Sequence, residues 1–215
     1  MDKNVATRYI PIGLMLFALF FGAGNLIFPA SMGQNAGVNV WYALIGFCIT
    51  GVGMPLLSVM AMGYSGCADL QEAAGRAHPL YGLFFTIVAY LAISPCSASP
   101  QKLVDRIGKL LTPALVLTIV LLIVQSFVSP LGDAQAPTKA YATPVVAAVQ
   151  GVLDGYNTLD AIAAFVFATL VINVVKDDCG LTDPKEITKQ VYKSGIVAVA
   201  LLAFIYIFIA KIGAE

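Results

Sequence analysis

The chain has 215 residues, of which 59% are hydrophobic and 11% are charged, and its formal net charge at pH 7 is zero. Soluble domains usually carry about 25% charged residues, so the composition excludes an ordinary water-soluble protein, and the balanced charge gives no sign of a nucleic-acid partner. No residue from Tyr9 to Ala68 is charged, and that stretch has room for two membrane spans of about 20 residues each. The sequence therefore predicts an all-α, polytopic membrane helix bundle.

Charge-poor runs predict six hydrophobic elements in a single transmembrane domain. They lie at about 10–33, 41–63, 80–96, 110–128, 143–175 and 194–210. The loops between them are short and polar, and none is long enough for a soluble domain. The positive residues of such short loops are expected to gather on the cytoplasmic side of the membrane.

The count of positive residues does not fit six crossings. With a cytoplasmic N-terminus, five Lys and Arg residues would lie inside and seven outside. If one span is missing near residues 96–101, ten lie inside and two outside, so the charge pattern favours a missing span and a cytoplasmic N-terminus. The alternative is that 80–96 is a re-entrant or interfacial element, because Ser94, Pro95 and Ser97 weaken its end.

The first element, which includes "LFALFFGAGNLIFPA" at residues 16–30, contains helix-breaking residues at its middle. Glycine in a helix is about 1 kcal/mol less favourable than alanine, and Pro29 lacks an N–H and clashes with the carbonyl of Asn25. Unpaired backbone groups cost several kcal/mol in lipid, so a break persists only where protein or a polar cavity receives it. Gly22 and Gly24 would also permit close packing of a neighbouring helix, but the asparagine at mid-depth favours a ligand site.

The element 143–175 would be roughly 50 Å long as one straight helix, which exceeds the hydrocarbon core of about 30 Å. Its centre, "DGYNTLD", combines helix breakers with capping residues, so Asn157 or Thr158 can cap a second half-helix. An ordinary water-exposed loop between two short segments is the alternative. Asp154 and Asp160 are six positions apart and do not share a helical face, which disfavours a proton relay between them. Two interrupted spans in one chain are typical of a secondary transporter.

The two breaks offer groups that suit a small zwitterion and a cation. The N-terminal end of a half-helix carries free N–H groups and partial positive charge, which suit a carboxylate. Freed carbonyls and the side-chain oxygens of Asn25 and Thr158 suit a hard cation such as Na⁺. An apolar wall for an aliphatic side chain is offered by Phe20, Phe21, Ala23 and Tyr156.

Two other functions stay open: a carrier of another small solute, such as a nucleobase, and a membrane scaffold or assembly subunit that binds no substrate. An enzyme is not expected, because the sequence contains no His/Glu metal set, no Ser/His pair and no nucleotide-binding loop. No cofactor is predicted.

Three segments, "FALFFGAGNLIFP", "VDRIGKLLTP" and "GYNTLDAIAAFVFA", resemble segments of the bacterial branched-chain amino acid carriers, the LIV-II cation symporters. The resemblance implies a multi-pass protein of the bacterial inner membrane that takes up leucine, isoleucine or valine with Na⁺ as the coupling ion, and H⁺ as the alternative. It also implies a fold similar to that of the leucine transporter, with an inverted repeat of five plus five spans, a cytoplasmic N-terminus and contact with membrane lipid.

The resemblance also implies where the site lies. The unwound segments would be Phe21 to Asn25 and Gly155 to Thr158. The implied Na⁺ ligands are Ala18, Phe21, Asn25 and Thr158. The implied substrate contacts are Phe21, Gly22, Ala23, Gly24, Asn25, Gly155, Tyr156 and Thr158.

The chain departs from the family pattern in two places. Carriers of this family continue after the third span into a fourth, whereas "YLAISPCSASPQKLVDRIG" passes directly to the approach of the fifth. The chain also stops at Glu215, at the end of the expected seventh span, so the eighth, which in this fold closes the cation site assigned to Ala18 and Phe21, is absent. The resemblance therefore predicts a fragment or an internally deleted copy of the carrier.

Overall fold

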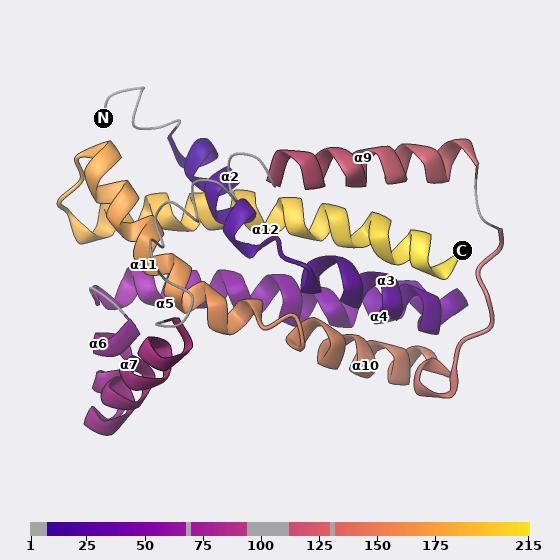
Figure 1. The fold of residues 1–215 in the computed structure, drawn as a ribbon, viewed down its shortest axis with the longest axis horizontal. Coiled ribbons are helices and arrows are strands. Elements are labelled where there is room, and N and C mark those ends of the chain that lie inside the picture. Colours follow the sequence, from indigo (N-terminus) through magenta and orange to yellow (C-terminus); the bar gives the residue numbers. More distant parts are fainter. Residues whose placement is uncertain (1–7, 68–69, 94–111, 130–131) are drawn as a thin grey trace.

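The computed structural model describes residues 8–67, 70–93, 112–129 and 132–215, and the regular elements of these residues are helical (Figure 1). The helices are α2 (Tyr9–Phe20), α3 (Gly24–Ala36), α4 (Val40–Cys48), α5 (Met54–Ser65), α6 (Leu70–Ala77), α7 (Pro79–Ile93), α9 (Thr112–Val128), α10 (Pro144–Tyr156), α11 (Asp160–Cys179) and α12 (Pro184–Ala214). Short helical turns at Gly37–Asn39 and Lys139–Tyr141 and a π-helical segment at Ile49–Gly53 complete the described part.

Two helical runs in the described residues are long and apolar enough to cross a membrane, Gly24–Ser65 and Pro184–Ala214. A third is added if Pro144–Tyr156 and Asp160–Asp177, which are bent by 42° at their junction, count as one span. Within the first run Gly37 has a φ of 49°, a conformation that favours glycine. The chain turns back at this glycine, so that α4 returns alongside α3 and α5 continues toward the opposite end of the bundle, where it packs against α11 and α12 (Figure 1).

The long helix α12 lies between the other helices and packs against α2, α3 and α5. Small residues let the backbones approach closely, as in many membrane proteins. A Cβ atom added to Gly33 of α3 would lie 2.0 Å from the carbonyl oxygen of Ala210, and one added to Gly151 of α10 would lie 1.9 Å from that of Ala43 in α4. Glycine is therefore required where α3 meets α12 and where α10 meets α4.

The helix α12 begins at Pro184, well before the expected element at 194–210. The Asp183 side chain caps its start by accepting a hydrogen bond from the Lys185 N–H at 3.1 Å, and Pro184 is at the first helical position, where its missing N–H costs nothing. The apolar run marks the part of the helix that is suited to lipid, and the polar first turns extend the same helix beyond it.

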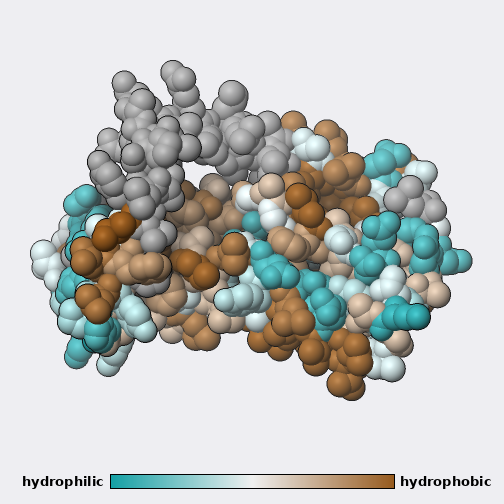
Figure 2. Space-filling model, turned by 60° about the horizontal axis from the view of Figure 1, so that its bottom comes forward, coloured by the Kyte–Doolittle hydropathy of each residue, from teal (hydrophilic) through white to brown (hydrophobic). Residues whose placement is uncertain are grey.

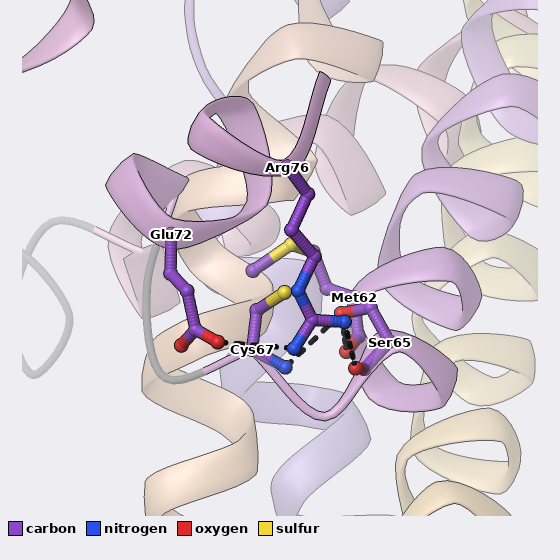
Figure 3. Close-up of polar contacts among 5 residues, drawn as sticks. All are labelled: Met62, Ser65, Cys67, Glu72 and Arg76. Carbon is purple, nitrogen blue, oxygen red and sulfur yellow. Dashed lines mark hydrogen bonds and ion pairs between the residues drawn. The ribbon is translucent and has the colours of Figure 1, made fainter. Parts of the chain in front are cut away.

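Figure 2 shows hydrophilic residues at both ends of the bundle and in the middle of this face, with hydrophobic residues gathered between them. At one end the Lys193 ammonium lies 5.4 Å from the centre of the Tyr9 ring. At the same end the Arg76 guanidinium donates to the carbonyl oxygen of Ser65 at 2.7 Å and pairs with Glu72 at 3.0 Å (Figure 3). Arg76 thereby fastens α6 to the last turn of α5.

The helix α7, which falls in the expected element 80–96, folds back against α6 instead of running along the bundle (Figure 1). A Cβ atom on Gly82 would lie 2.8 Å from the carbonyl oxygen of Gln71, so the two short helices are in close backbone contact. The sequence left open a re-entrant or interfacial element at 80–96, and whether α7 crosses the membrane stays a prediction. The position of the expected missing span, near 96–101, lies outside the described residues.

Candidate functional site

The first element expected from the sequence, at about 10–33, is broken between α2 and α3, where the sequence predicts the break. The helix α2 ends at Phe20 and α3 begins at Gly24. The Gly22 N–H turns away from its helical acceptor, the carbonyl of Ala18, and donates to Asn25 Oδ1 at 3.0 Å. The asparagine side chain therefore satisfies one of the N–H groups that the break exposes.

The break leaves acceptors as well as donors without helical partners. In the described part of the chain, no backbone N–H donates to the carbonyl oxygens of Ala18, Leu19 or Phe20. Phe21 is buried and its ring stacks on Phe17 with the ring centres 5.2 Å apart. The end of α2 thus presents several carbonyl oxygens, which are ligands for a hard cation.

The second candidate span is broken between α10 and α11. The helix α10 ends at Tyr156 and α11 begins at Asp160. Leu159 adopts the left-handed conformation with a φ of 60°, which a residue other than glycine, asparagine or aspartate rarely does. The Thr158 hydroxyl donates to the carbonyl oxygen of Gly155 at 2.8 Å and so closes the last turn of α10.

The expected unwound segment from Gly155 to Thr158 needs correction at its start. Gly155 and Tyr156 belong to α10, and a Cβ atom on Gly155 would lie 2.4 Å from both the Phe47 carbonyl oxygen and Thr50 Oγ1. The glycine is needed for this close approach to α4, and the helix continues through it. Tyr156 is exposed. Whether either residue contacts a substrate stays a prediction.

The two breaks meet inside the protein at the Asn25 side chain. Asn25 Nδ2 donates to Asp160 Oδ2 and to the Tyr206 hydroxyl, each at 2.5 Å, and the Tyr206 hydroxyl donates to Asp160 Oδ2 at 3.2 Å. All three side chains are buried, with 2%, 5% and 0% of their surface exposed. A Cβ atom on Gly24 would lie 3.9 Å from Thr158 Cα. Of the residues expected at the site, the structure thus brings Gly24 next to Thr158, and both Asn25 and Thr158 next to Asp160.

Asp160 and Tyr206 are the residues that the sequence analysis did not assign to the site. Asp160 is the first residue of α11, where a carboxylate is favoured by the partial positive charge of a helix N-terminus, and that position is the signal that could have identified it. Tyr206 lies in an apolar helix and its ring meets Phe47 edge-on at 5.0 Å. Only the three-dimensional packing connects it to the breaks.

The other carboxylate of the second broken span lies apart from this cluster. Asp154 accepts hydrogen bonds from the Tyr141 hydroxyl and, at 3.2 Å, from Gln150 Nε2. Burial, together with the hydrogen bond and negative charge of Asp154, raises the pKa of the Tyr141 phenol. Asp154 therefore ties α10 to the preceding loop, and it does not share a network with Asp160.

Comparison with known proteins gives consistent matches along the chain. The sequence model of the family described as "Branched-chain amino acid transport protein" matches residues 5–101 and 95–215. The chain is similar to the "Branched-chain amino acid permease BrnQ" of Bacillus subtilis (strain 168), at 39% identity over 258 residues that cover 100% of this chain and 58% of the relative. It is also similar to the permease BraB of the same organism, at 39% identity over 95% of this chain and 55% of the relative.

A third relative is the "Branched-chain amino acid permease BrnQ" of Lactobacillus delbrueckii subsp. lactis, at 34% identity over 100% of this chain and 57% of the relative. The chain thus spans somewhat more than half the length of the curated relatives that it matches. No solved structure matches it.

Proposed function

Because the chain belongs to the branched-chain amino acid transport protein family, we propose that it is part of a carrier that moves leucine, isoleucine or valine together with Na⁺ across the bacterial plasma membrane. The observation that carries this proposal is the meeting of two helix breaks at the buried side chain of Asn25. Close packing explains one break in a membrane helix, whereas two breaks that face each other are typical of the substrate site of a secondary transporter.

In this proposal the substrate binds where the half-helices begin and end. The N–H groups near Gly22 to Gly24 take the carboxylate, and Gly155, Tyr156 and Phe21 form the wall beside the aliphatic side chain. The cation takes oxygens from Ala18, Phe21, Asn25 and Thr158. The carbonyl of Ala18, which has lost the Gly22 N–H to Asn25, supports this assignment.

We further propose a leucine-transporter-like arrangement in which these breaks belong to the first and sixth spans of an inverted repeat. Each broken span presents the N-terminus of a half-helix to the same place, Gly24 from one and Asp160 from the other. Such paired half-helix ends are the common feature of inverted-repeat carriers.

The distribution of basic residues supports a cytoplasmic N-terminus. Arg8, Arg76 and Lys193 lie at the end of the bundle where α2 begins and α5 ends, whereas Lys139 and Lys211 lie near the opposite end (Figure 1). The positive-inside rule assigns the first of these ends to the cytoplasm.

We infer that a segment is missing inside the chain rather than only beyond its ends. The match to the relative of Bacillus subtilis runs over 258 residues, more than the 215 of this chain, and the family model matches in two pieces that meet at residues 95–101. If the span that follows α7 is lost, α7 would have to cross the membrane without a return span. In this proposal α7 instead folds back on α6 and does not cross, so that the basic loops before and after it stay on the same side of the membrane.

The substrate site is tested by two substitutions at one glycine. A Cβ atom on Gly24 would lie 3.5 Å from the Phe28 ring, an ordinary contact, so Gly24→Ala should retain binding of radiolabelled leucine to the purified chain in lipid nanodiscs. Gly24→Leu should abolish it, because Thr158 Cα already lies 3.9 Å from the Cβ position and the longer side chain would fill the place where the two breaks meet. Membrane insertion and melting temperature should be the same for both variants.

The coupling is tested by replacing Na⁺ with choline in the binding assay, and by imposing a Na⁺ gradient on proteoliposomes that contain a full-length relative. Leucine affinity unchanged in Gly24→Leu would reject the assigned substrate site. Binding and uptake that are indifferent to Na⁺ would reject the cation role. A chain that binds no leucine in either salt would favour a scaffold or another solute.

A further inference from the structure

Asp160 differs from every other charged side chain in the described part of the chain because it is buried, with 5% of its surface exposed. It lies at the first residue of α11, between the two halves of a candidate membrane span. A charged group in such a position is expensive unless it is paired, and it marks an ion or substrate pathway in most membrane proteins. Asp160 therefore needs a positive partner or a function.

The partners that Asp160 has among the described residues are neutral. Asn25 and Tyr206 both donate to Oδ2. The ion pairs formed by the described residues lie at the ends of the bundle, between Arg76 and Glu72 and within α12, and none of them reaches Asp160. Neutral donors solvate the carboxylate without cancelling its charge.

Oxygen atoms suitable for a cation lie beside the carboxylate. The Thr158 hydroxyl hydrogen-bonds to the Asp160 carboxyl and also lies 2.8 Å from the carbonyl oxygen of Gly155. A hydroxyl oxygen has two lone pairs whichever acceptor takes its proton, so it can also bind a cation. The hydrogen bonds from Asn25 and Tyr206 both end on Oδ2 of Asp160, so Oδ1 takes neither of them. Carboxylate, hydroxyl and carbonyl oxygens are the ligands that hard cations prefer.

We propose that Asp160 is the anionic ligand of the coupling cation, a Na⁺ ion held between the two helix breaks with Thr158 as a neighbouring ligand. This inference rests on the proposed function and adds to it a full negative charge that the ligands suggested by the sequence do not supply. A buried Na⁺ is stabilised far more by a carboxylate than by neutral oxygens alone, since the charge of the ion and that of the ligand cancel in a medium of low dielectric constant.

The same geometry links the cation to the first break. Asn25 uses its amide nitrogen on Asp160 and Tyr206 and its amide oxygen on the Gly22 N–H. A cation on Asp160 that also takes Asn25 Oδ1, as proposed above, competes with the Gly22 N–H for that oxygen and weakens the bond between Gly22 and Asn25. The Gly22 N–H then becomes available to a substrate carboxylate. Na⁺ should therefore raise the affinity for leucine, and leucine should raise the affinity for Na⁺ by the same factor.

The test uses thermal unfolding of the purified full chain in detergent, at one pH and one ionic strength, in NaCl, KCl or choline chloride. Na⁺ should raise the melting temperature of the wild-type chain relative to the other two salts, because a ligand that binds the folded state stabilises it. Asp160→Asn should abolish this difference. The matched control is Asp154→Asn, which changes the other carboxylate of the same broken span and should keep the Na⁺ effect.

A second measurement needs no variant. A hydrophobic carbodiimide labels buried carboxyl groups, and mass spectrometry of the wild-type chain identifies the labelled residue. Na⁺ should protect Asp160 from labelling, while choline at equal concentration should not. If Asp160→Asn lowered the melting temperature equally in all three salts and kept the Na⁺ difference, Asp160 would be a structural residue and the proposal would be overturned. Labelling of Asp160 that is insensitive to Na⁺ would also overturn it.

The outcomes separate this inference from the proposed function. If Na⁺ raises the melting temperature in a way that depends on Asp160, but the chain binds no leucine, the cation site would be supported and the proposed substrate would be rejected. Na⁺-dependent leucine binding that survives Asp160→Asn would support the carrier and reject the role of Asp160.

Discussion

Gly155 offers a sharp test of whether a glycine at a helix break contacts a substrate or a neighbouring helix. The resemblance to the carrier family assigns Gly155 to the unwound, substrate-binding segment. The structure places it inside α10, against the Phe47 carbonyl and Thr50 Oγ1. The substitution Gly155→Ala adds one methyl group at this contact, and the two interpretations predict different results.

The magnitude follows from the contact distances. The new Cβ atom would lie 2.4 Å from the Phe47 carbonyl oxygen and from Thr50 Oγ1, whereas real Cβ atoms essentially never come within 3.0 Å of another group. The helices would have to separate by roughly half an ångström or more, and overpacking of this kind costs about 1–3 kcal/mol. The better helix propensity of alanine returns about 1 kcal/mol. Because the new Cβ atom would meet two groups at 2.4 Å, the cost should lie in the upper part of the overpacking range, at about 2–3 kcal/mol. After the gain in helix propensity, we expect Gly155→Ala to lower the free energy of unfolding by about 1–2 kcal/mol, which is a factor of about 5–30 in the ratio of folded to unfolded protein.

The assay is reversible unfolding of the purified chain in mixed detergent and sodium dodecyl sulfate micelles. It follows the fluorescence of Trp41, the single tryptophan, which lies in the same helix, α4, as Phe47. Gly53→Ala is the control, because a Cβ atom there would lie 3.7 Å from the nearest atom, and it should be as stable as the wild type. If Gly155→Ala unfolded like the wild type but bound leucine more weakly, the packing explanation would be refuted and the substrate contact supported.

Three further perturbations test other parts of the structure. Asn25→Ala removes the donor to the buried Asp160 carboxylate and leaves the Gly22 N–H without its acceptor. It should lower the free energy of unfolding, measured in the same micelle assay, by about 3 kcal/mol. A loss under about 1 kcal/mol would contradict the buried network. The raised pKa of Tyr141 keeps its hydroxyl protonated and bonded to Asp154 in the folded chain. The stability that this hydrogen bond contributes is therefore complete below the ordinary phenol pKa near 10 and is lost as the pH rises further. The fall in melting temperature at alkaline pH should be smaller in Tyr141→Phe. Lys139→Cys and Lys189→Cys should react with a membrane-impermeant thiol reagent from opposite sides in oriented vesicles, and reaction from one side would reject the proposed topology.

The helix breaks could be predicted from the sequence because their causes are local. Gly22, Gly24 and Pro29 weaken a helix wherever they occur, and the structure begins α3 at Gly24. The second break was expected from the excessive length of the element at 143–175 and from its capping residues. Its position was wrong by about half a turn, because the sequence does not reveal that α4 approaches Gly155 closely and extends the helix through it.

The cluster at the breaks could not be predicted, because its members are distant in the chain. Asn25 and Asp160 are 135 positions apart, and Asn25 and Tyr206 are 181 apart. Periodicity indicates which residues of one helix share a face, but it gives no information on which faces of different helices meet. The spacing of Asp154 and Asp160 indicated that the two carboxylates do not share a helical face, and they indeed lie in different hydrogen-bond networks. The spacing could not show that Asp160 becomes buried.

Glycine and helix breakage turn out to be largely separate features in this protein. The glycines whose Cβ atom would collide with a neighbouring backbone, such as Gly33, Gly151 and Gly155, lie inside continuous helices and set how closely those helices pack. The second break is instead formed by a leucine in the left-handed conformation, at a cost of roughly 1–2 kcal/mol. Leu159 is exposed, so its side chain does not repay this cost through packing. The left-handed conformation of Leu159 turns α11 so that Asp160 begins the new helix beside Asn25. Because this places a carboxylate against the first break, we regard the two breaks as one site.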